Sequence, residues 1–258
     1  MIKHSLPDLN ILVVLSLSLA VTRCQVSEVL GEELETKPIQ MIQDWGGKTF
    51  FKRGELSEVI LNRANFKPGE LTILTGFNEI TDVSLENTHV NEQDLSTLAN
   101  LPKLEWLNLY QTKISKKGLQ ILSLSKSIQL LPLGESGISD EALVHLSNMQ
   151  QLTYLGLRGN FITDSSAFHL SKLINLQGLY LGETQITNQT VTEIAHLSRL
   201  QKLWLHDLPI TDEAVSHLAK LTELKEVHIY ATNISAQGAR TLQSSLPRCR
   251  VIHEIFPE

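Results

Sequence analysis

The feature that most constrains this chain is a 24-residue period that runs from Leu56 to Pro247 without a gap. Written in rows of 24, the sequence is apolar at positions one, four, six, eleven and nineteen of all eight rows, which is forty of forty residues. Only 42% of the whole chain is hydrophobic, so composition alone does not produce this pattern. A period of this length predicts structural units that stack on one another, because one unit cannot bury its apolar side chains by itself.

Each position of the repeat predicts a local structure. Positions four and six alternate with outward-facing residues, which is typical of a strand buried on one face. Position nine is small and polar in six rows, as at Thr112 and Asn160, and favours a turn in which the side chain bonds to the backbone. Position twelve is Ser or Thr in six rows, as at Ser115 and Thr187, and predicts a helix N-cap. Acids after this cap, such as Asp164, suit the helix dipole.

The consensus LxxLxLxxTxITDxxLxxLxxL, most regular from Leu200 through Ile210-Thr211-Asp212 to Leu218, resembles the leucine-rich repeat family. Its length and turn residue are most similar to exported bacterial repeat proteins, and the same repeat phase occurs in eukaryotic F-box substrate receptors. Eight rows of 24 make 192 of the 258 residues. The resemblance implies an α/β solenoid with a right-handed, curved parallel sheet on the concave face and helices on the convex face. It is specific for fold and not for function.

The ends of the chain predict a signal peptide and two caps. The apolar stretch 11–21 follows a basic start and includes a small-residue cleavage pattern at Ser18-Leu19-Ala20. It is shorter than the roughly 20 residues that cross a bilayer, so no transmembrane span is expected. We therefore expect export to the periplasm, the envelope or the medium, with a cytoplasmic location as the alternative. The expected domains are a signal peptide at 1–20, an N-terminal cap at 21–55, eight repeats at 56–247 and a C-terminal cap at 248–258.

Composition argues against two classes of function. The chain has 22 basic and 28 acidic residues and a net charge of −6, so it lacks the excess of cations that neutralises nucleic-acid phosphates. Cys24 and Cys249 are the only cysteines and lie at opposite ends of the repeat array. Neither a disulfide framework nor a cysteine zinc site is therefore expected.

Aromatic side chains concentrate at positions three, five and seven, which point out of the sheet into the concave face. These positions hold all four tyrosines and two of the three tryptophans. Tyr and Trp anchor many protein interfaces, although the same rings could instead only stabilise neighbouring strands. The candidate partner-binding residues are Trp106, Asn108, Tyr110, Tyr154, Arg158, Tyr180, Trp204, His206, His228 and Tyr230.

Glycines and acids shape the expectation for this face. Gly134, Gly156, Gly178 and Gly182 lie between two aromatic clusters and predict a hollow flanked by two aromatic ridges. With position eight included, the face carries seven acids and three bases. This charge disfavours nucleic acid and favours a protein or peptide of some basic character, with a glycan stacked on the aromatics as an alternative.

The sequence offers little support for catalysis or for a bound cofactor. It has no Gly-rich phosphate loop, no HExxH pair and no GxSxG elbow. His206 and His228 lie diagonally on adjacent strands near Asp207, but such trios are usually polar interface residues, so no metal is expected.

We therefore expect a non-catalytic binding module that uses an aromatic-rich concave face for protein–protein interaction. Two alternatives stay open: an intracellular adaptor resembling F-box/leucine-rich repeat substrate receptors, and a glycan-binding repeat protein.

Overall fold

A computed structural model describes residues 36–254 of the chain. The expected signal peptide at 1–20 lies outside these residues. The chain divides into two compact units, Met1–Asp44 and Trp45–Glu258. In the first unit residues 36–44 are helical. The second unit contains the repeats and is described below.

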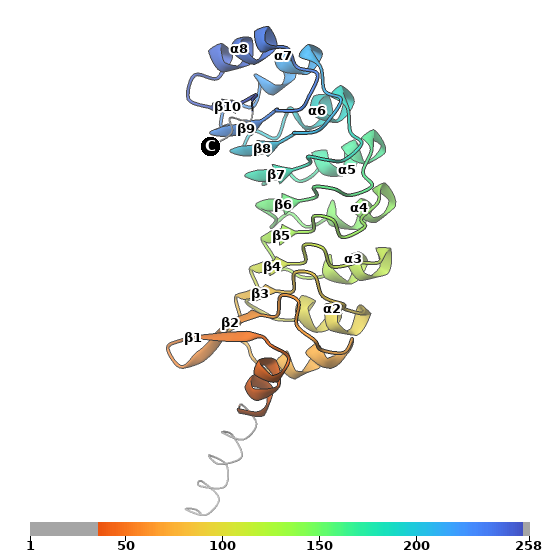
Figure 1. Ribbon diagram of the computed structural model, residues 1–258, viewed down its shortest axis with the longest axis vertical. Helices are drawn as coiled ribbons and strands as arrows, with labels where there is room; N and C mark the ends of the chain where they lie inside the picture. The colour runs from red at the N-terminus through yellow and green to blue at the C-terminus, as the bar shows by residue number, and fades with distance from the viewer. Residues whose placement is uncertain (1–35, 255–258) are drawn as a thin grey trace, which may run out of the picture. The chain divides into compact units, whose positions relative to one another are not determined.

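The second unit is built on one ten-stranded sheet in which the strands follow one another in sequence order (Figure 1). Strand β1 pairs antiparallel with β2, and every later junction is parallel. The strands are β1 (Lys48–Lys52), β2 (Glu55–Ile60), β3 (Asp82–Ser84), β4 (Trp106–Asn108), β5 (Leu130–Pro132), β6 (Tyr154–Gly156), β7 (Gly178–Tyr180), β8 (Lys202–Trp204), β9 (Glu226–His228) and β10 (Arg250–Ile252).

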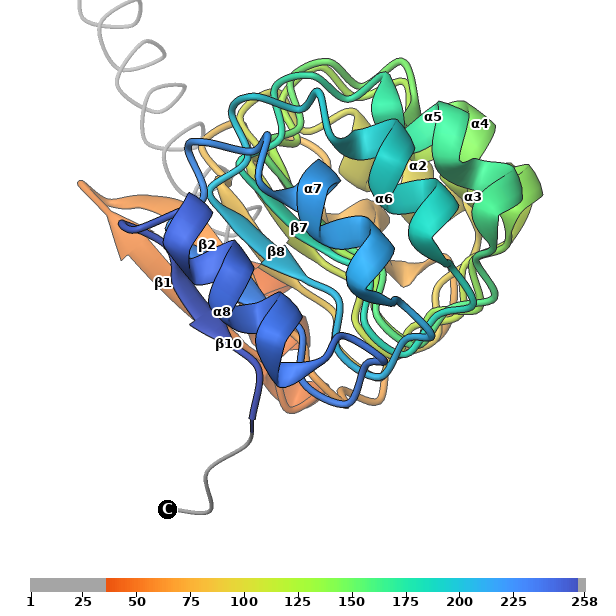
Figure 2. The same cartoon turned by 90° about the horizontal axis from the view of Figure 1, so that it is seen from above.

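A layer of short helices covers one face of this sheet (Figure 2). From the second strand onward, helical structure lies between each strand and the next, and in two repeats a 3-10 turn runs directly into an α-helix. This alternation confirms the predicted α/β leucine-rich repeat solenoid. The helical segments are η1 (Glu70–Leu74), α2 (Glu92–Ala99), α3 (Lys116–Leu122), α4 (Asp140–Leu146), η2 (Asp164–Ser166), α5 (Ala167–Ser171), α6 (Asn188–Ile194), η3 (Asp212–Ala214), α7 (Val215–Leu218) and α8 (Ala236–Ser245).

The core lies between these two layers and consists of the periodic apolar positions. Thirty-nine of the forty residues at positions one, four, six, eleven and nineteen are buried, and Val90 is half-buried. Position four pairs with position four at the strand junctions, as in Leu179 with Leu203 and Val227 with Val251. The 24-residue period therefore sets the register of the sheet, since a shift by one residue would turn the apolar side chains outward.

The polar positions of the repeat fasten each turn to the backbone, as predicted. At position nine, Thr112 Oγ1 donates to the carbonyl of Leu85 at 2.6 Å, and Asn160 Nδ2 donates to the carbonyl of Leu133 at 2.7 Å. At position twelve, Ser115 Oγ accepts from the amide of Gly118 and caps α3. These bonds satisfy backbone groups that would otherwise be buried without a partner.

The acids at position thirteen do more than complement the helix dipole. Asp164 Oδ1 accepts from the amide of Thr187 at 2.9 Å, and its Oδ2 accepts from Thr187 Oγ1 at 2.6 Å. Asp140 and Asp212 bind the position-twelve residue of the following repeat in the same way. Each acid therefore links its own repeat to the helix cap of the next one.

This link makes a pH-dependent contribution to stability. Burial raises the pKa of Asp164, but hydrogen bonds from Thr187 and Thr190 outweigh it and leave the pKa below the ordinary value of 3.8. A lowered pKa in the folded state stabilises the protein above pH 3.8, and this stabilisation is lost as the pH falls through the folded-state pKa.

Asn188 makes the equivalent bond to Thr211 without a titrating group, so Asp164→Asn is expected to reduce the acid sensitivity of folding. Urea unfolding from about pH 5 to about pH 2 measures this; parallel stability curves for parent and variant would contradict it.

Candidate functional site

Each strand of the repeat array is followed by a left-handed turn that the residue types did not predict. Position eight is left-handed in every repeat, with φ of 55° at Glu135, 57° at Glu183 and 56° at Asp207, and only Gly159 among these eight residues is a glycine. A left-handed conformation costs a non-glycine residue about 1–2 kcal/mol, so the stacked strands must impose it. Because the turn follows every strand at the same repeat position, the residues at positions seven and eight of successive repeats form a continuous row beside the strands.

Four predicted residues form a run of touching rings across strands β6 to β9. The ring centroids of Tyr154 and Tyr180 lie 4.9 Å apart in an edge-to-face arrangement. Tyr180 stacks on Trp204 at 4.0 Å with an interplanar angle of 2°, and Trp204 contacts His228 at 4.5 Å. All four side chains are half-buried, whereas the position-four leucines beneath them are fully buried. The rings therefore lie on the sheet and outside the hydrophobic core.

Two further predicted residues extend this run along position seven. His206 stacks on Tyr230 with centroids 4.8 Å apart and an angle of 11°. Tyr230 lies 6.0 Å from His228, and His206 lies 6.1 Å from Trp204. We call the six residues together the aromatic ladder; its members are Tyr154, Tyr180, Trp204, His206, His228 and Tyr230.

The expected hollow between two aromatic ridges is wrong, because neighbouring rings cover the glycines. A Cβ atom on Gly178 would lie 2.8 Å from the ring of Tyr154, and one on Gly134 would lie 2.8 Å from the ring of Tyr110. The ring of His206 covers Gly182 in the same way. A glycine on this sheet therefore makes room for the ring of an adjacent strand.

Tyr110 and Arg158 lie in a charged network beside the ladder. The Tyr110 hydroxyl donates to Glu135, and Arg158 Nη2 donates to Glu183 Oε1 at 2.6 Å. The hydrogen bond from Tyr110, followed by one from Gln111, holds the pKa of Glu135 below its ordinary value. Glu135 therefore stays ionised at neutral pH and keeps this part of the face acidic.

Trp106 and Asn108 are separate from the ladder. Asn108 Nδ2 donates to Ser84 Oγ at 3.0 Å, and Asn108 Oδ1 accepts from the amide of Tyr110, so Asn108 braces the sheet. Trp106 has no ring partner within residues 36–254 and pairs in register with Leu130. Leu130 is 37% exposed and pairs in turn with Tyr154, which extends the apolar surface across β4 to β6. Leu130 is not among the residues predicted for this face, because a single outward aliphatic side chain does not differ in residue type from an ordinary surface leucine.

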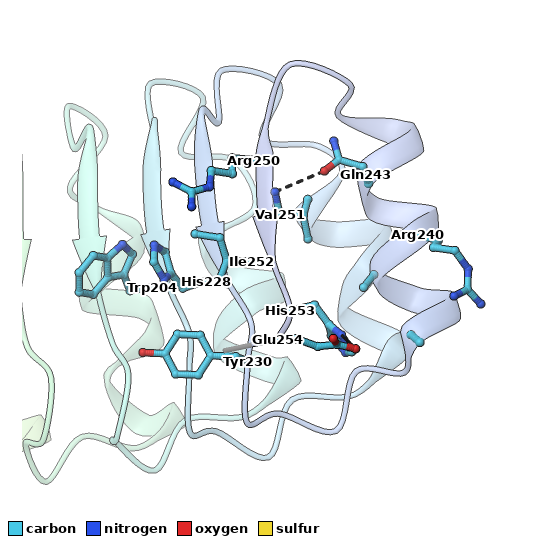
Figure 3. A pocket seen from close by; sticks show the side chains of 12 residues that line it. Trp204, His228, Tyr230, Arg240, Gln243, Arg250, Val251, Ile252, His253 and Glu254 are labelled. Carbon is cyan, nitrogen blue, oxygen red and sulfur yellow. Dashed lines mark hydrogen bonds and ion pairs between the residues drawn. The ribbon is translucent and has the colours of Figure 1, made fainter. Parts of the chain in front are cut away.

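A hollow lies at the C-terminal end of the ladder (Figure 3). It has a volume of about 740 Å³ and extends from Trp204 and His228 past β10 to the exposed side of α8. Gln243 of α8 bonds to the backbone of β10: its Oε1 accepts from the amide of Val251, and its Nε2 donates to the carbonyl of Cys249. These bonds occupy part of the open sheet edge, which would otherwise be free to pair with another strand.

The predicted neighbourhood of His206, His228 and Asp207 is only partly correct. His228 Nε2 bonds to Glu226 Oε1 at 2.7 Å, and His228 does not belong to the group of ligand atoms around His206 and Asp207. His206 Nδ1 bonds to Asp207 Oδ2 at 2.8 Å. Glu183 takes the third place, since one ligand atom each from Glu183, His206 and Asp207 lie within 4.8 Å of one another.

Within residues 36–254, no helix is both long enough and apolar enough to cross a bilayer.

Comparison with known proteins places the chain by its fold. No family model matches it, and neither does any curated protein. Among solved structures, internalin C2 of Listeria monocytogenes is 28% identical, with a TM-score of 0.62 over 77% of this chain and 81% of that chain. A second internalin of the same organism, inlF, is 20% identical, with a TM-score of 0.55 over 77% of this chain and 67% of the other.

Proposed function

We propose that this leucine-rich repeat protein, whose fold is that of the internalins, is a non-catalytic binding module that holds a protein or peptide partner on the strand face of its sheet. The observation that carries this proposal is the aromatic ladder, six rings that touch one another across four strands while most of them remain half-exposed. Rigid aromatic side chains lose little conformational entropy on binding and supply much of the energy at protein interfaces.

The geometry of the rings favours a protein over a glycan. Sugars bind proteins by lying flat on an exposed aromatic face. The face of Trp204 toward β7 is occupied by Tyr180 and its other neighbour is His228, while one face of Tyr154 lies on Gly178. What these rings still offer is edges and polar groups, which suit the irregular surface of a polypeptide.

The charge of the face favours a partner with basic groups. The hydrogen bond from His228 holds the pKa of Glu226 below its ordinary value, as the bond from Tyr110 does for Glu135. Both carboxylates are therefore ionised at neutral pH. Arg158 pairs with Glu183 and neutralises that carboxylate, but the face carries seven acids against three bases and therefore stays acidic. Complementary charge would guide a basic partner to the ladder and orient it there.

We also propose that the protein is exported, on the strength of the apolar N-terminal segment, and that its domain bounds are those predicted from the period. N-terminal sequencing of the mature protein is expected to begin beyond about residue 20. An intact Met1 or Ile2 would contradict export and would favour the intracellular adaptor instead.

Truncation of the ladder is expected to weaken binding. We expect Trp204→Ala to reduce the affinity for the partner by about 1–2 kcal/mol, which is about five- to thirtyfold in Kd, because it removes a central ring. The partner is captured from an extract of the source cells with the immobilised full chain, purified, and titrated against parent and variant by calorimetry.

Phe168→Ala is the matched control, because this ring is 61% exposed on the helix layer. It is expected to bind as the parent does. Thermal unfolding of each variant ensures that affinity is measured on folded protein. Equal affinity of parent and Trp204→Ala would remove the ladder from the binding surface.

A further inference from the structure

We propose that Glu183, His206 and Asp207 form a binding site for a divalent transition-metal ion such as Zn²⁺. The three side chains come from adjacent strand ends: Glu183 follows β7, and His206 and Asp207 follow β8. One ligand atom from each lies within 4.8 Å of the others. This site does not depend on the proposed partner, because the ion binds to the chain alone.

The ligand atoms need to move only a short distance to hold an ion. Zinc binds nitrogen and oxygen at about 2.0–2.2 Å, so two ligand atoms of one tetrahedral ion lie about 3.3–3.6 Å apart. His206 Nδ1 and Asp207 Oδ2 lie 2.8 Å apart and have to separate slightly to reach this spacing, whereas the ligand oxygen of Glu183, within 4.8 Å of the others, has to approach by about one bond length at most. The side chains of Glu183 and Asp207 are 37% and 48% exposed and are free to make this adjustment by rotation. Their exposure also leaves the remaining coordination positions open to water.

The imidazole of His206 is already held in place. The His206 side chain is only 4% exposed. Its ring lies between the ring of Tyr230, stacked at 4.8 Å, and the backbone of Gly182. Its Nδ1 lies 2.8 Å from Asp207 Oδ2, so one nitrogen and one oxygen that could bind the ion already lie side by side. A rigid ligand loses little entropy when it binds an ion.

The chemistry of the donor set favours zinc. One imidazole with two carboxylates suits zinc and its neighbours, whereas calcium and magnesium prefer oxygen donors alone. The two carboxylates also supply the negative charge that a divalent ion requires. Arg158 partly offsets this charge, because its Nη2 lies 2.6 Å from Glu183 Oε1. Arg158 and the ion therefore compete for Glu183.

Because Arg158 competes with the ion, some substitutions are expected to weaken zinc binding and another is expected to strengthen it. Zinc chloride is titrated into the full chain by calorimetry near neutral pH, and a saturable site with one equivalent of Zn²⁺ is expected. Asp207→Asn and Glu183→Gln, two exposed positions at which folding should be unaffected, are each expected to weaken binding by at least about tenfold. Arg158→Gln is expected to tighten it by about threefold or more, since the competing cation is removed.

Glu135→Gln is the matched control, because it removes a position-eight carboxylate from the same row but outside the trio. It should bind zinc as the parent does. The absence of a saturable zinc isotherm in the parent would overturn the proposal. An unchanged affinity in both Asp207→Asn and Glu183→Gln would overturn it as well, because the zinc would then be bound by other histidines of the surface.

Discussion

Replacing Asp94 with alanine is expected to destabilise the protein by about 3–5 kcal/mol, the largest effect of any single change proposed for this chain. Asp94 is fully buried in α2. Its carboxylate accepts from the amides of Gly69 at 2.8 Å, Leu71 at 3.0 Å and Asn91 at 3.0 Å. Removal of the carboxylate leaves these amides without their acceptor, and the amide of Leu71 belongs to a fully buried residue. Urea unfolding followed by circular dichroism measures the loss.

The repeat itself provides a control for this prediction. Position fifteen is Asp94 in the second repeat and Ser166 in the fifth, where the hydroxyl makes one bond to the carbonyl of Thr163. Ser166→Ala is therefore expected to cost only about 0.5–1.5 kcal/mol. Asp94→Asn should fall between the two, because the amide keeps one acceptor oxygen but turns an N–H group toward the backbone donors. Similar losses for Asp94→Ala and Ser166→Ala would show that the buried carboxylate contributes no more than an ordinary hydrogen bond.

Gly182→Ala is expected to destabilise the protein by about 1–3 kcal/mol and to displace the ring of His206. The new methyl group would lie 2.6 Å from Cε1 and 2.7 Å from Cδ2 of that ring, closer than real contacts allow. The ring cannot move aside at no cost, because Tyr230 stacks on it. The variant is therefore expected to lose the stacking of His206 on Tyr230, which a crystal structure shows directly, together with part of its stability in urea.

Gly156→Ala is the matched control on the same face of the sheet. Its nearest contact would be the hydroxyl of Tyr154 at 3.1 Å, at the end of a side chain that can yield. This change is expected to be neutral or stabilising by up to about 1 kcal/mol, because alanine restricts the unfolded chain more than glycine does. If Gly182→Ala proved as stable as Gly156→Ala, the ring of His206 would not be fixed over the glycine.

The glycines show why the site was harder to predict than the fold. Glycine has no side chain, so the sequence around Gly178 and Gly182 predicts a hollow in the face. The structure fills that space with the rings of Tyr154 and His206 from the neighbouring strands. Which way a ring leans depends on contacts between repeats, and no pattern within one repeat specifies it. The proposed metal site depends on contacts between repeats in the same way. The sequence places His228 near His206 and Asp207, whereas the stacking of adjacent turns brings Glu183 to them instead.

The sequence alone determined the register of the solenoid and the face on which each side chain lies. Side chains alternate along a strand and the apolar positions recur every 24 residues, so one register buries them all. Only the tertiary structure decided which outward side chains touch. The left-handed turn at position eight, the carboxylate of Asp94 beneath two backbone segments and the stacking of Trp204 between Tyr180 and His228 all depend on neighbouring repeats. The physical reason is that burial is specified residue by residue, whereas contact between two side chains depends on both rotamers and on the backbone that carries them.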